Sequence, residues 1–431
     1  MNPTELRRQI GQPLYRNSLF LMGNTVVLTG LGFVFWIVVA RFYTEAEVGL
    51  GSAIISSVML LALVSGLGLD AALIRFLPKA ARPVDMVNSC FTLVATTALV
   101  VSGIFIAGLP VWSPAVDFIR VQPLFILAFV LFAACWPLAG LMGSVFVARR
   151  KAQYVLVKST IFSLLKLPLA IVLAIFFHAF GIVASWGVAV AIALVVSAFF
   201  LLPRVLEHYK PAPRLDLGIV KGIWKYSAGN YFASLFAAAP LLALPIIVVN
   251  IAGAEQNAHF YVAWMIGGLL FAISTAVSQS LFAEGSHFEE ELPLHAQRAF
   301  RFALLLLVPG IALVVLLGKW LLLLFGESYS SSALTLLQTL GFSSIFVGVN
   351  TVYFSMLLVR GQIGELTVLR ALTAVAVLVA SALAIPALGI NGVGYVWIGI
   401  QGLVSIYVLL RVTSPTLSKK LRQANREGRQ K

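Results

Sequence analysis

The placement of basic residues constrains the fold of this chain more than any other feature of its sequence. Long apolar segments follow one another along the chain, and nearly all of its 30 Lys and Arg residues fall in alternate gaps between these segments. A helix needs about 20 apolar residues to cross a bilayer core, and basic side chains stay on the cytoplasmic side. The pattern predicts an all-α membrane protein with twelve transmembrane helices and both termini in the cytoplasm. The basic residues outside the pattern are Arg41, Arg120, Lys166 and Lys319, and the expected spans are 17–40, 48–73, 86–108, 120–147, 154–177, 180–202, 224–251, 258–283, 301–318, 333–358, 365–386 and 390–411.

The spans fall into two sets of six that are joined by a polar linker. The two sets echo each other weakly, since Gly181-Ile182 opens the sixth span and Gly389-Ile390 opens the twelfth. Because six is an even number, both sets enter the bilayer in the same orientation, and a pseudo-twofold axis along the membrane normal should relate the two lobes across a central cavity. The expected parts are an N-terminal tail 1–16, a first lobe 17–202, a linker 203–223, a second lobe 224–411 and a basic tail 412–431.

The composition excludes a soluble protein, because the chain is 60% hydrophobic and only 11% charged. The net charge of +14 could indicate a nucleic-acid partner. However, these charges flank membrane helices on one side, where they set the topology and meet anionic headgroups. The bilayer is therefore the expected partner, and no nucleic acid is expected. Cys90 and Cys135 lie within spans, where we expect them to act as small apolar core residues.

Lys166 is the most informative single residue in the sequence. It lies about twelve residues into the fifth span, roughly 18 Å deep at 1.5 Å per residue, which is too deep for its ammonium to reach the interface. A Lys at the bilayer centre costs about 2.5–3.5 kcal/mol on insertion scales. We therefore expect it to face a wet cavity or a partner rather than lipid.

Three neighbours of Lys166 complete a candidate substrate site. Ser159 and Ser163 share a helical face with Lys166, and Lys158 approaches from the cytoplasmic end. Because no carboxylate lies at a matching depth, an anionic substrate is the expected partner of Lys166. The alternative is a structural Lys that is bonded to carbonyls freed by Pro168 or to the polar face of its own helix.

Neutral polar side chains form stripes on several other spans. Hydroxyl and amide groups both donate and accept hydrogen bonds, as a sugar substrate requires. The same residues also hold membrane helices together, so this structural alternative stays open for each stripe. The stripe residues that we place in the candidate substrate site are Asn24, Asn230, Ser234, Gln279 and Thr351.

Asp70 lies near the cytoplasmic end of the second span, where it is expected either to pair with Arg75 or Arg149 as a gate or to cap a solvated helix end. The glycines before it match a dinucleotide fingerprint but lack the preceding strand that the motif requires. The sequence shows no metal-ligand spacing, no phosphate-binding loop and no nucleophile–base pair. We therefore expect no metal, no cofactor and no enzymatic activity.

Four segments near the N-terminus form a recognisable pattern: Phe35-Trp36-Ile37-Val38-Val39-Ala40-Arg41-Phe42-Tyr43, Glu47-Val48-Gly49, Gly66-Leu67-Gly68-Leu69-Asp70 and Arg75-Phe76-Leu77-Pro78. Through these segments the chain resembles the oligosaccharide flippases, which are polysaccharide transporters of the multidrug/oligosaccharidyl-lipid/polysaccharide superfamily. Two features depart from related families. The first span lacks the arginines that mark lipid II flippases, and it lacks the acidic residue expected of sodium- or proton-driven drug exporters.

The resemblance implies a flippase that moves polyprenyl-diphosphate-linked oligosaccharide from the cytoplasmic to the outer leaflet by alternating access. It further implies a bacterial or archaeal plasma membrane, with polysaccharide polymerase or assembly proteins as candidate partners. Two alternatives remain: a cation-coupled multidrug exporter, and a non-transporting membrane scaffold for polysaccharide assembly. The central cation argues against the exporter, which would need an intramembrane carboxylate and a net-negative cavity.

Overall fold

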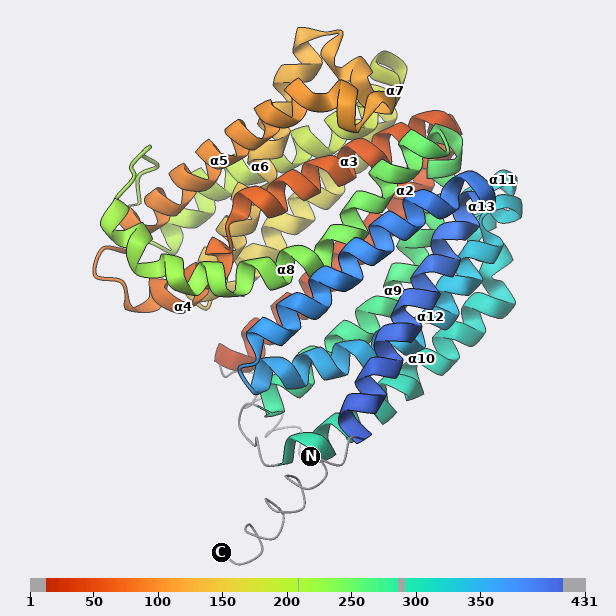
Figure 1. Cartoon of the computed structure of the whole chain (residues 1–431). Helices are drawn as coiled ribbons and strands as arrows, with labels where there is room; N and C mark the ends of the chain where they lie inside the picture. Colours follow the sequence, from red (N-terminus) through yellow and green to blue (C-terminus); the bar gives the residue numbers. More distant parts are fainter. Residues whose placement is uncertain (1–12, 208, 286–290, 414–431) are drawn as a thin grey trace, which may run out of the picture. The chain divides into compact units, whose positions relative to one another are not determined.

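The computed structural model describes residues 13–207, 209–285 and 291–413, and within these ranges every regular element is a helix (Figure 1). Short 3-10 turns and one π-helical turn supplement the α-helices, for example Pro114–Arg120 and Ser197–Leu201. The α-helices are α2 (Pro13–Phe42), α3 (Glu45–Gly66), α4 (Leu69–Phe76), α5 (Pro83–Trp112), α6 (Pro123–Ala148), α7 (Ala152–Val196), α8 (Leu217–Ile251), α9 (Ala254–Gly285), α10 (Leu292–Leu323), α11 (Glu327–Ser332), α12 (Leu334–Val359) and α13 (Ile363–Thr413).

Two of the long helices each contain two membrane spans. Among the described residues, ten helical stretches are long and apolar enough to cross a membrane. Two of them run for 53 and 50 residues: Ala152–Arg204, which is α7 with the turns that follow it, and Ile363–Val412 of α13. Each is broken at one residue with positive φ, at His178 in α7 (φ 46, ψ −132) and at Gly389 in α13 (φ 57, ψ −150). Counting both halves of these two helices confirms the predicted twelve spans and the all-α class. The break at His178 lies three residues before Gly181-Ile182, and the other break falls on the glycine of Gly389-Ile390, so both lie at the pairs from which the internal repeat was predicted.

Some predicted boundaries were wrong. The second span was expected to reach residue 73, but α3 ends at Gly66 because Leu67 and Gly68 both adopt left-handed backbone angles (φ 51 and 68). The chain then restarts as the short helix α4. The ninth span was expected at 301–318, but α10 covers 292–323 because its first turns continue the helix through a basic, amphipathic stretch.

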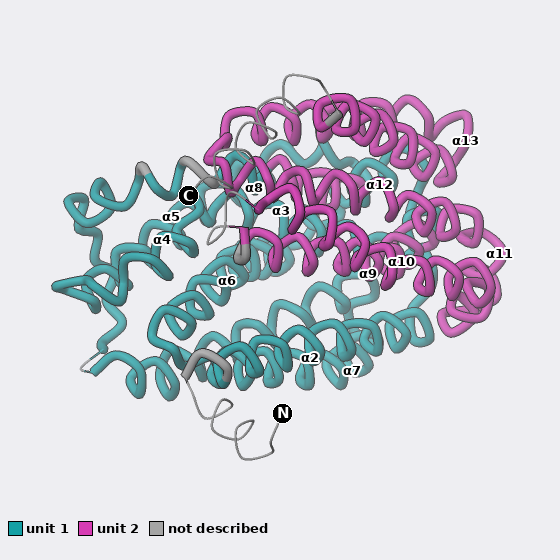
Figure 2. The backbone as a smooth tube through the Cα atoms, turned by 90° about the horizontal axis from the view of Figure 1, so that it is seen from below, with its two compact units in different colours: residues 1–235, 245–258 teal, residues 236–244, 259–431 magenta. Residues whose placement is uncertain are grey.

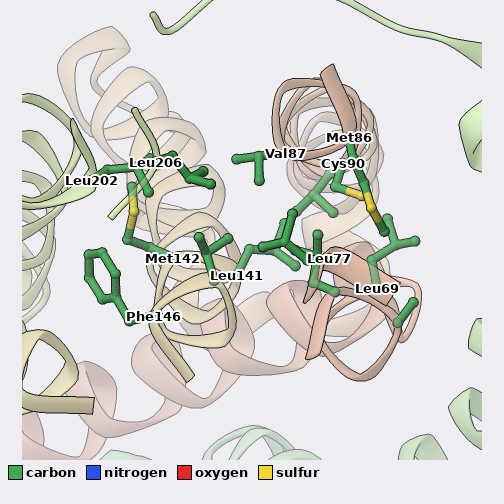
Figure 3. Close-up of a cluster of buried hydrophobic side chains, with 14 of the residues drawn as sticks. Leu69, Leu77, Met86, Val87, Cys90, Leu141, Met142, Phe146, Leu202 and Leu206 are labelled. Atoms are coloured by element: carbon green, nitrogen blue, oxygen red, sulfur yellow. The ribbon is translucent and has the colours of Figure 1, made fainter. Parts of the chain in front are cut away.

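The described chain forms two compact units, which are coloured separately in Figure 2. Unit 1 comprises residues 1–235 and 245–258, and unit 2 comprises residues 236–244 and 259–431. Unit 1 has an apolar core in which side chains from α4, α5 and α6 meet those that follow α7 (Figure 3). Cys90 is fully buried in this core, as predicted, whereas Cys135 is only half-buried. The labelled core residues are Leu69, Leu77, Met86, Val87, Cys90, Leu141, Met142, Phe146, Leu202 and Leu206.

The polar linker lies along the first turns of α5. Arg82 pairs with Asp216 and Asp85 pairs with Arg214, each at 2.8 Å. Asp216 also caps α8 by accepting hydrogen bonds from the backbone N–H groups of Gly218 and Ile219. The N–H of Ile219 first, with Arg82 and the N–H of Gly218, holds the pKa of Asp216 below its usual value. The sequence predicted a polar linker here but not its ion pairs with α5.

Candidate functional site

Lys166 lies in the first half of α7, and only 2% of its surface is exposed. Its Nζ atom lies 4.9 Å from the ring centre of Phe35, 4.8 Å from that of Phe162 and 5.0 Å from that of Trp186. These distances are within the range of cation–π attraction. The three rings form an aromatic cage around the ammonium, and we use this name for Phe35, Phe162 and Trp186 below.

Three segments of unit 1 build the aromatic cage. Phe35 comes from α2, Phe162 lies one turn before Lys166 on α7, and Trp186 follows the break at His178. The rings support one another, since Phe162 meets Trp186 edge-on at 5.5 Å. Trp136 of α6 stacks on Trp186, with their ring centres 5.0 Å apart. The cage therefore depends on how the breaks and the packing of these helices place the rings.

The surroundings of the Lys166 ammonium are aromatic. Among the described residues, no carboxylate lies within ion-pair distance of the Lys166 ammonium. The groups that surround its Nζ atom are the three ring faces of the aromatic cage. Ring faces carry partial negative charge and can hold a cation without an acid. Sequence reasoning missed the cage because a ring on α2 and a ring on the second half of α7 have no recognisable spacing relative to Lys166.

The residues predicted beside Lys166 divide into two groups. Ser159 and Ser163 are buried near Lys166 on the same helical face. The Ser163 hydroxyl and the Trp186 indole N–H are buried and have no hydrogen-bond partner among the described residues. Lys158 is engaged elsewhere, because its ammonium donates a short hydrogen bond to the carbonyl of Ala139 on α6. The cage region therefore contains an ammonium, a hydroxyl and an indole N–H, all of which can donate hydrogen bonds to an anion.

The neutral stripe residues lie in several environments. In unit 1, the buried Asn24 side-chain oxygen has no partner among the described residues, and Ser234 is exposed. The side chain of Asn230 lies outside what the structure describes. In unit 2, Gln279 is exposed, and the Thr351 hydroxyl donates to Val347 and Gly348 carbonyls of its own helix. Their role in substrate binding stays a prediction.

A neighbouring pair in unit 2 shows the structural alternative directly. The Ser278 hydroxyl on α9 donates to the Thr351 carbonyl on α12 at 2.7 Å, and the Ser355 hydroxyl donates back to the Ser278 carbonyl at 2.9 Å. These reciprocal bonds join two membrane helices. Serines in such stripes can therefore serve helix packing without contacting a substrate.

The residues of the predicted gate do not meet in this structure. Asp70 is exposed on α4. The Arg75 guanidinium lies 4.4 Å from the ring centre of Tyr226 on α8, in a cation–π contact. Arg149 is half-buried at the end of α6. The described residues contain no ion pair between Asp70 and either arginine, so the gate stays a prediction.

No group of three or more His, Cys, Asp and Glu side chains within the described ranges could hold a metal ion. What unit 1 offers instead is a cation deep in a membrane span, enclosed by rings and accompanied by buried hydrogen-bond donors. Such an arrangement can exchange a weak attraction to rings for stronger hydrogen bonds to an anion.

Comparison with known proteins places the fold. A family model described as polysaccharide biosynthesis protein matches residues 14–282, and no curated protein matches the chain. The lipid II flippase MurJ, inward closed, has a TM-score of 0.74 at 11% identity, covering 94% of this chain and 89% of that one. An inward-facing MATE family multidrug resistance transporter of the MOP superfamily has a TM-score of 0.69 at 15% identity, and the match covers 95% of this chain and 99% of that one. A MOP superfamily transporter from Pyrococcus furiosus has a TM-score of 0.63 at 16% identity, and the match covers 96% of each chain. A binding pocket of reverse polarity is reported for that transporter.

Proposed function

The chain belongs to the polysaccharide biosynthesis protein family and has the fold of MOP superfamily transporters, and from this premise we propose that it is a flippase for polyprenyl-diphosphate-linked oligosaccharide. In this proposal the substrate moves from the cytoplasmic to the outer leaflet of a plasma membrane by alternating access. Lys166 attracts the diphosphate, and the neutral stripes pass the glycan while the polyprenyl tail stays in lipid.

The observation that carries the proposal is the deep cation without an acid. Among the described residues the Lys166 ammonium is held only by ring faces, which attract a cation by about 0.5–2 kcal/mol. Hydrogen bonds from an ammonium to phosphate oxygens are charge-assisted and stronger than neutral ones. A diphosphate entering this region would therefore draw Lys166 out of the aromatic cage, and the free donors of Ser163 and Trp186 would add to its binding.

The membrane potential supplies a direction for transport. Moving one negative charge outward across an inside-negative membrane is favourable by about 2.3 kcal/mol per 100 mV. An anionic lipid head that leaves Lys166 toward the outer face would gain this energy. The proposal therefore needs no intramembrane carboxylate for coupling.

The aromatic cage also bears on the drug-exporter alternative. Rings arranged around a cation are the usual means of recognising quaternary ammonium ligands. Here the cage already holds the protein's own cation, and a second cation would be repelled by Lys166. The cage thus favours an anionic substrate over a cationic drug.

The test is surface-glycan complementation in a strain that lacks the native gene. We expect Lys166→Ala to lose at least tenfold in activity, since one lost charge-assisted contact is worth about 1.5–3 kcal/mol. Lys166→Arg should retain part of the activity. Lys319→Ala is the matched control, because it removes an equal charge from an exposed position outside the cytoplasmic set.

Three outcomes would contradict the proposal. Full activity of Lys166→Ala at normal protein level would remove Lys166 from transport. Tolerance of Lys166→Glu would favour the scaffold alternative, which needs no charge at this position. Drug resistance on overexpression without any effect on surface glycan would favour the exporter.

A further inference from the structure

Unit 2 contains a groove between α9 and α10 that the proposed transport route does not use. Its volume is about 500 Å³. One end carries two basic side chains, His295 and Arg298, and the rest is mostly apolar. The other lining residues are Ile273, Ala276, Val277, Ser280, Leu281, Ala299, Phe302 and Leu306.

The groove runs along α10 from the level of the headgroups into the hydrocarbon. α10 has 32 residues and so measures about 48 Å, longer than a bilayer core of about 30 Å. Its N-terminal turns carry His295, Arg298 and Arg301, which place this end at the interface. Phe302 and Leu306, 54% and 41% exposed, follow one and two turns deeper. The basic end of the groove thus lies at the level of the lipid phosphates, and its apolar wall lies at the level of the acyl chains.

The charges at the basic end favour one anionic headgroup. The His295 Nε2 atom lies 3.5 Å from a carboxylate oxygen of Glu291, so His295 is engaged within its own helix. Arg298 is exposed at the groove mouth and is left as the main cationic contact. A guanidinium binds phosphate oxygens in a bidentate manner, and basic pockets on the cytoplasmic side of membrane helices bind anionic lipid heads.

We propose that this groove binds one anionic phospholipid of the cytoplasmic leaflet, with its phosphate on Arg298 and an acyl chain along Ala276, Phe302 and Leu306. The apolar wall makes the groove selective for a lipid, because a free phosphate would contact only the basic end. The site is built from unit 2 residues, so it is independent of Lys166 and of the transported substrate. It extends the proposed function with a structural lipid that the transporter carries.

The test measures lipid binding to the full-length protein in detergent by native mass spectrometry. The probes are phosphatidylglycerol, phosphatidylcholine with the same acyl chains, and glycerol phosphate as a headgroup without chains. We expect phosphatidylglycerol to bind more tightly than phosphatidylcholine, and glycerol phosphate not to compete. Arg298→Gln should weaken phosphatidylglycerol binding about fivefold, the effect of one basic residue near a membrane surface.

Two matched pairs of variants locate the site. Arg301→Gln removes an equal charge one turn along the same helix but outside the groove, and it should change binding less than twofold. Ala276→Phe fills the groove from an exposed position and should abolish the extra phosphatidylglycerol binding, whereas Ala272→Phe, exposed one turn away, should not. Equal binding by Arg298→Gln and wild type, or displacement of the lipid by glycerol phosphate, would overturn the proposal. Surface-glycan transport is not the readout, so the two proposals can fail separately.

Discussion

At Lys166, burial and charge oppose each other, and the aromatic cage resolves the conflict. Placing an ammonium at the bilayer centre costs about 2.5–3.5 kcal/mol on insertion scales. Cation–π attraction to three ring faces within 5.0 Å of Nζ offsets part of this free-energy cost without an acidic partner. The cation thus stays available to an incoming anion, which a salt bridge would prevent.

The strength of the cage can be measured with a double-mutant cycle. We expect Lys166→Met and Trp186→Leu to couple by about 1 kcal/mol in thermal unfolding of the detergent-purified protein, because Met keeps the length of the side chain without the charge. The same cycle with Trp320→Leu, at a 65% exposed tryptophan, should show no coupling. A coupling near zero at Trp186 would mean that the ring packs against Lys166 without attracting its charge.

The sequence placed Lys166 on one face with Ser159 and Ser163, because the helical face follows from counting residues. It could not place Phe35 or Trp186 beside the ammonium. Those contacts depend on how α2 and both halves of α7 pack together, and no local spacing encodes this packing.

At the scale of elements, the close approach of α3 to the start of α9 depends on one glycine. A Cβ atom on Gly49 would lie 1.8 Å from the carbonyl oxygen of Ala254, and Asn257 donates a 2.7 Å hydrogen bond to the Gly49 carbonyl. The two backbones meet here with no room for a side chain. This is the small-residue packing that membrane helices use.

We therefore expect Gly49→Ala to destabilise the protein by about 1–3 kcal/mol, the usual cost of overpacking. The measurement is the loss of folded protein on heating, followed by size-exclusion chromatography. Gly103→Ala is the control, since no atom lies within 4 Å of its added Cβ and alanine favours the helix by up to about 1 kcal/mol. Equal stability of the two variants would show that the helices separate easily at Gly49.

The linker offers a test of pH dependence at the same scale. The pKa of Asp216 is lower in the folded protein than its ordinary value of 3.8, chiefly because the Ile219 N–H donates to it. Its charge therefore stabilises the docked linker above that value, and this contribution disappears as the pH falls through the lowered pKa. We expect Asp216→Asn to have a lower melting temperature than wild type at pH 7. This difference in melting temperature should disappear at pH values below about 3.8. Glu207→Gln is the control, because it changes an exposed acid of the same segment. It should melt at the same temperature as wild type at either pH.

At the scale of the whole molecule, the distribution of charge predicts the orientation in the membrane. In a background with Cys90 and Cys135 replaced by Ala, we expect a membrane-impermeant thiol reagent to label Val121→Cys on intact cells but not Lys221→Cys. Val121 is 78% exposed between two spans on the predicted outer side, and Lys221 is exposed in the first turns of α8 on the predicted inner side. The reverse labelling pattern would place both termini outside.

The sequence by itself determined the class of this protein and its twelve spans. These properties depend on segment length, hydropathy and the cost of moving charge across a bilayer, all of which are sums over neighbouring residues. The tertiary structure decided which groups surround Lys166, where α3 and α7 break, and that α9 and α10 enclose a groove with Arg298 at its mouth. These features join residues far apart in the chain, and their contacts depend on the packing of whole helices against one another.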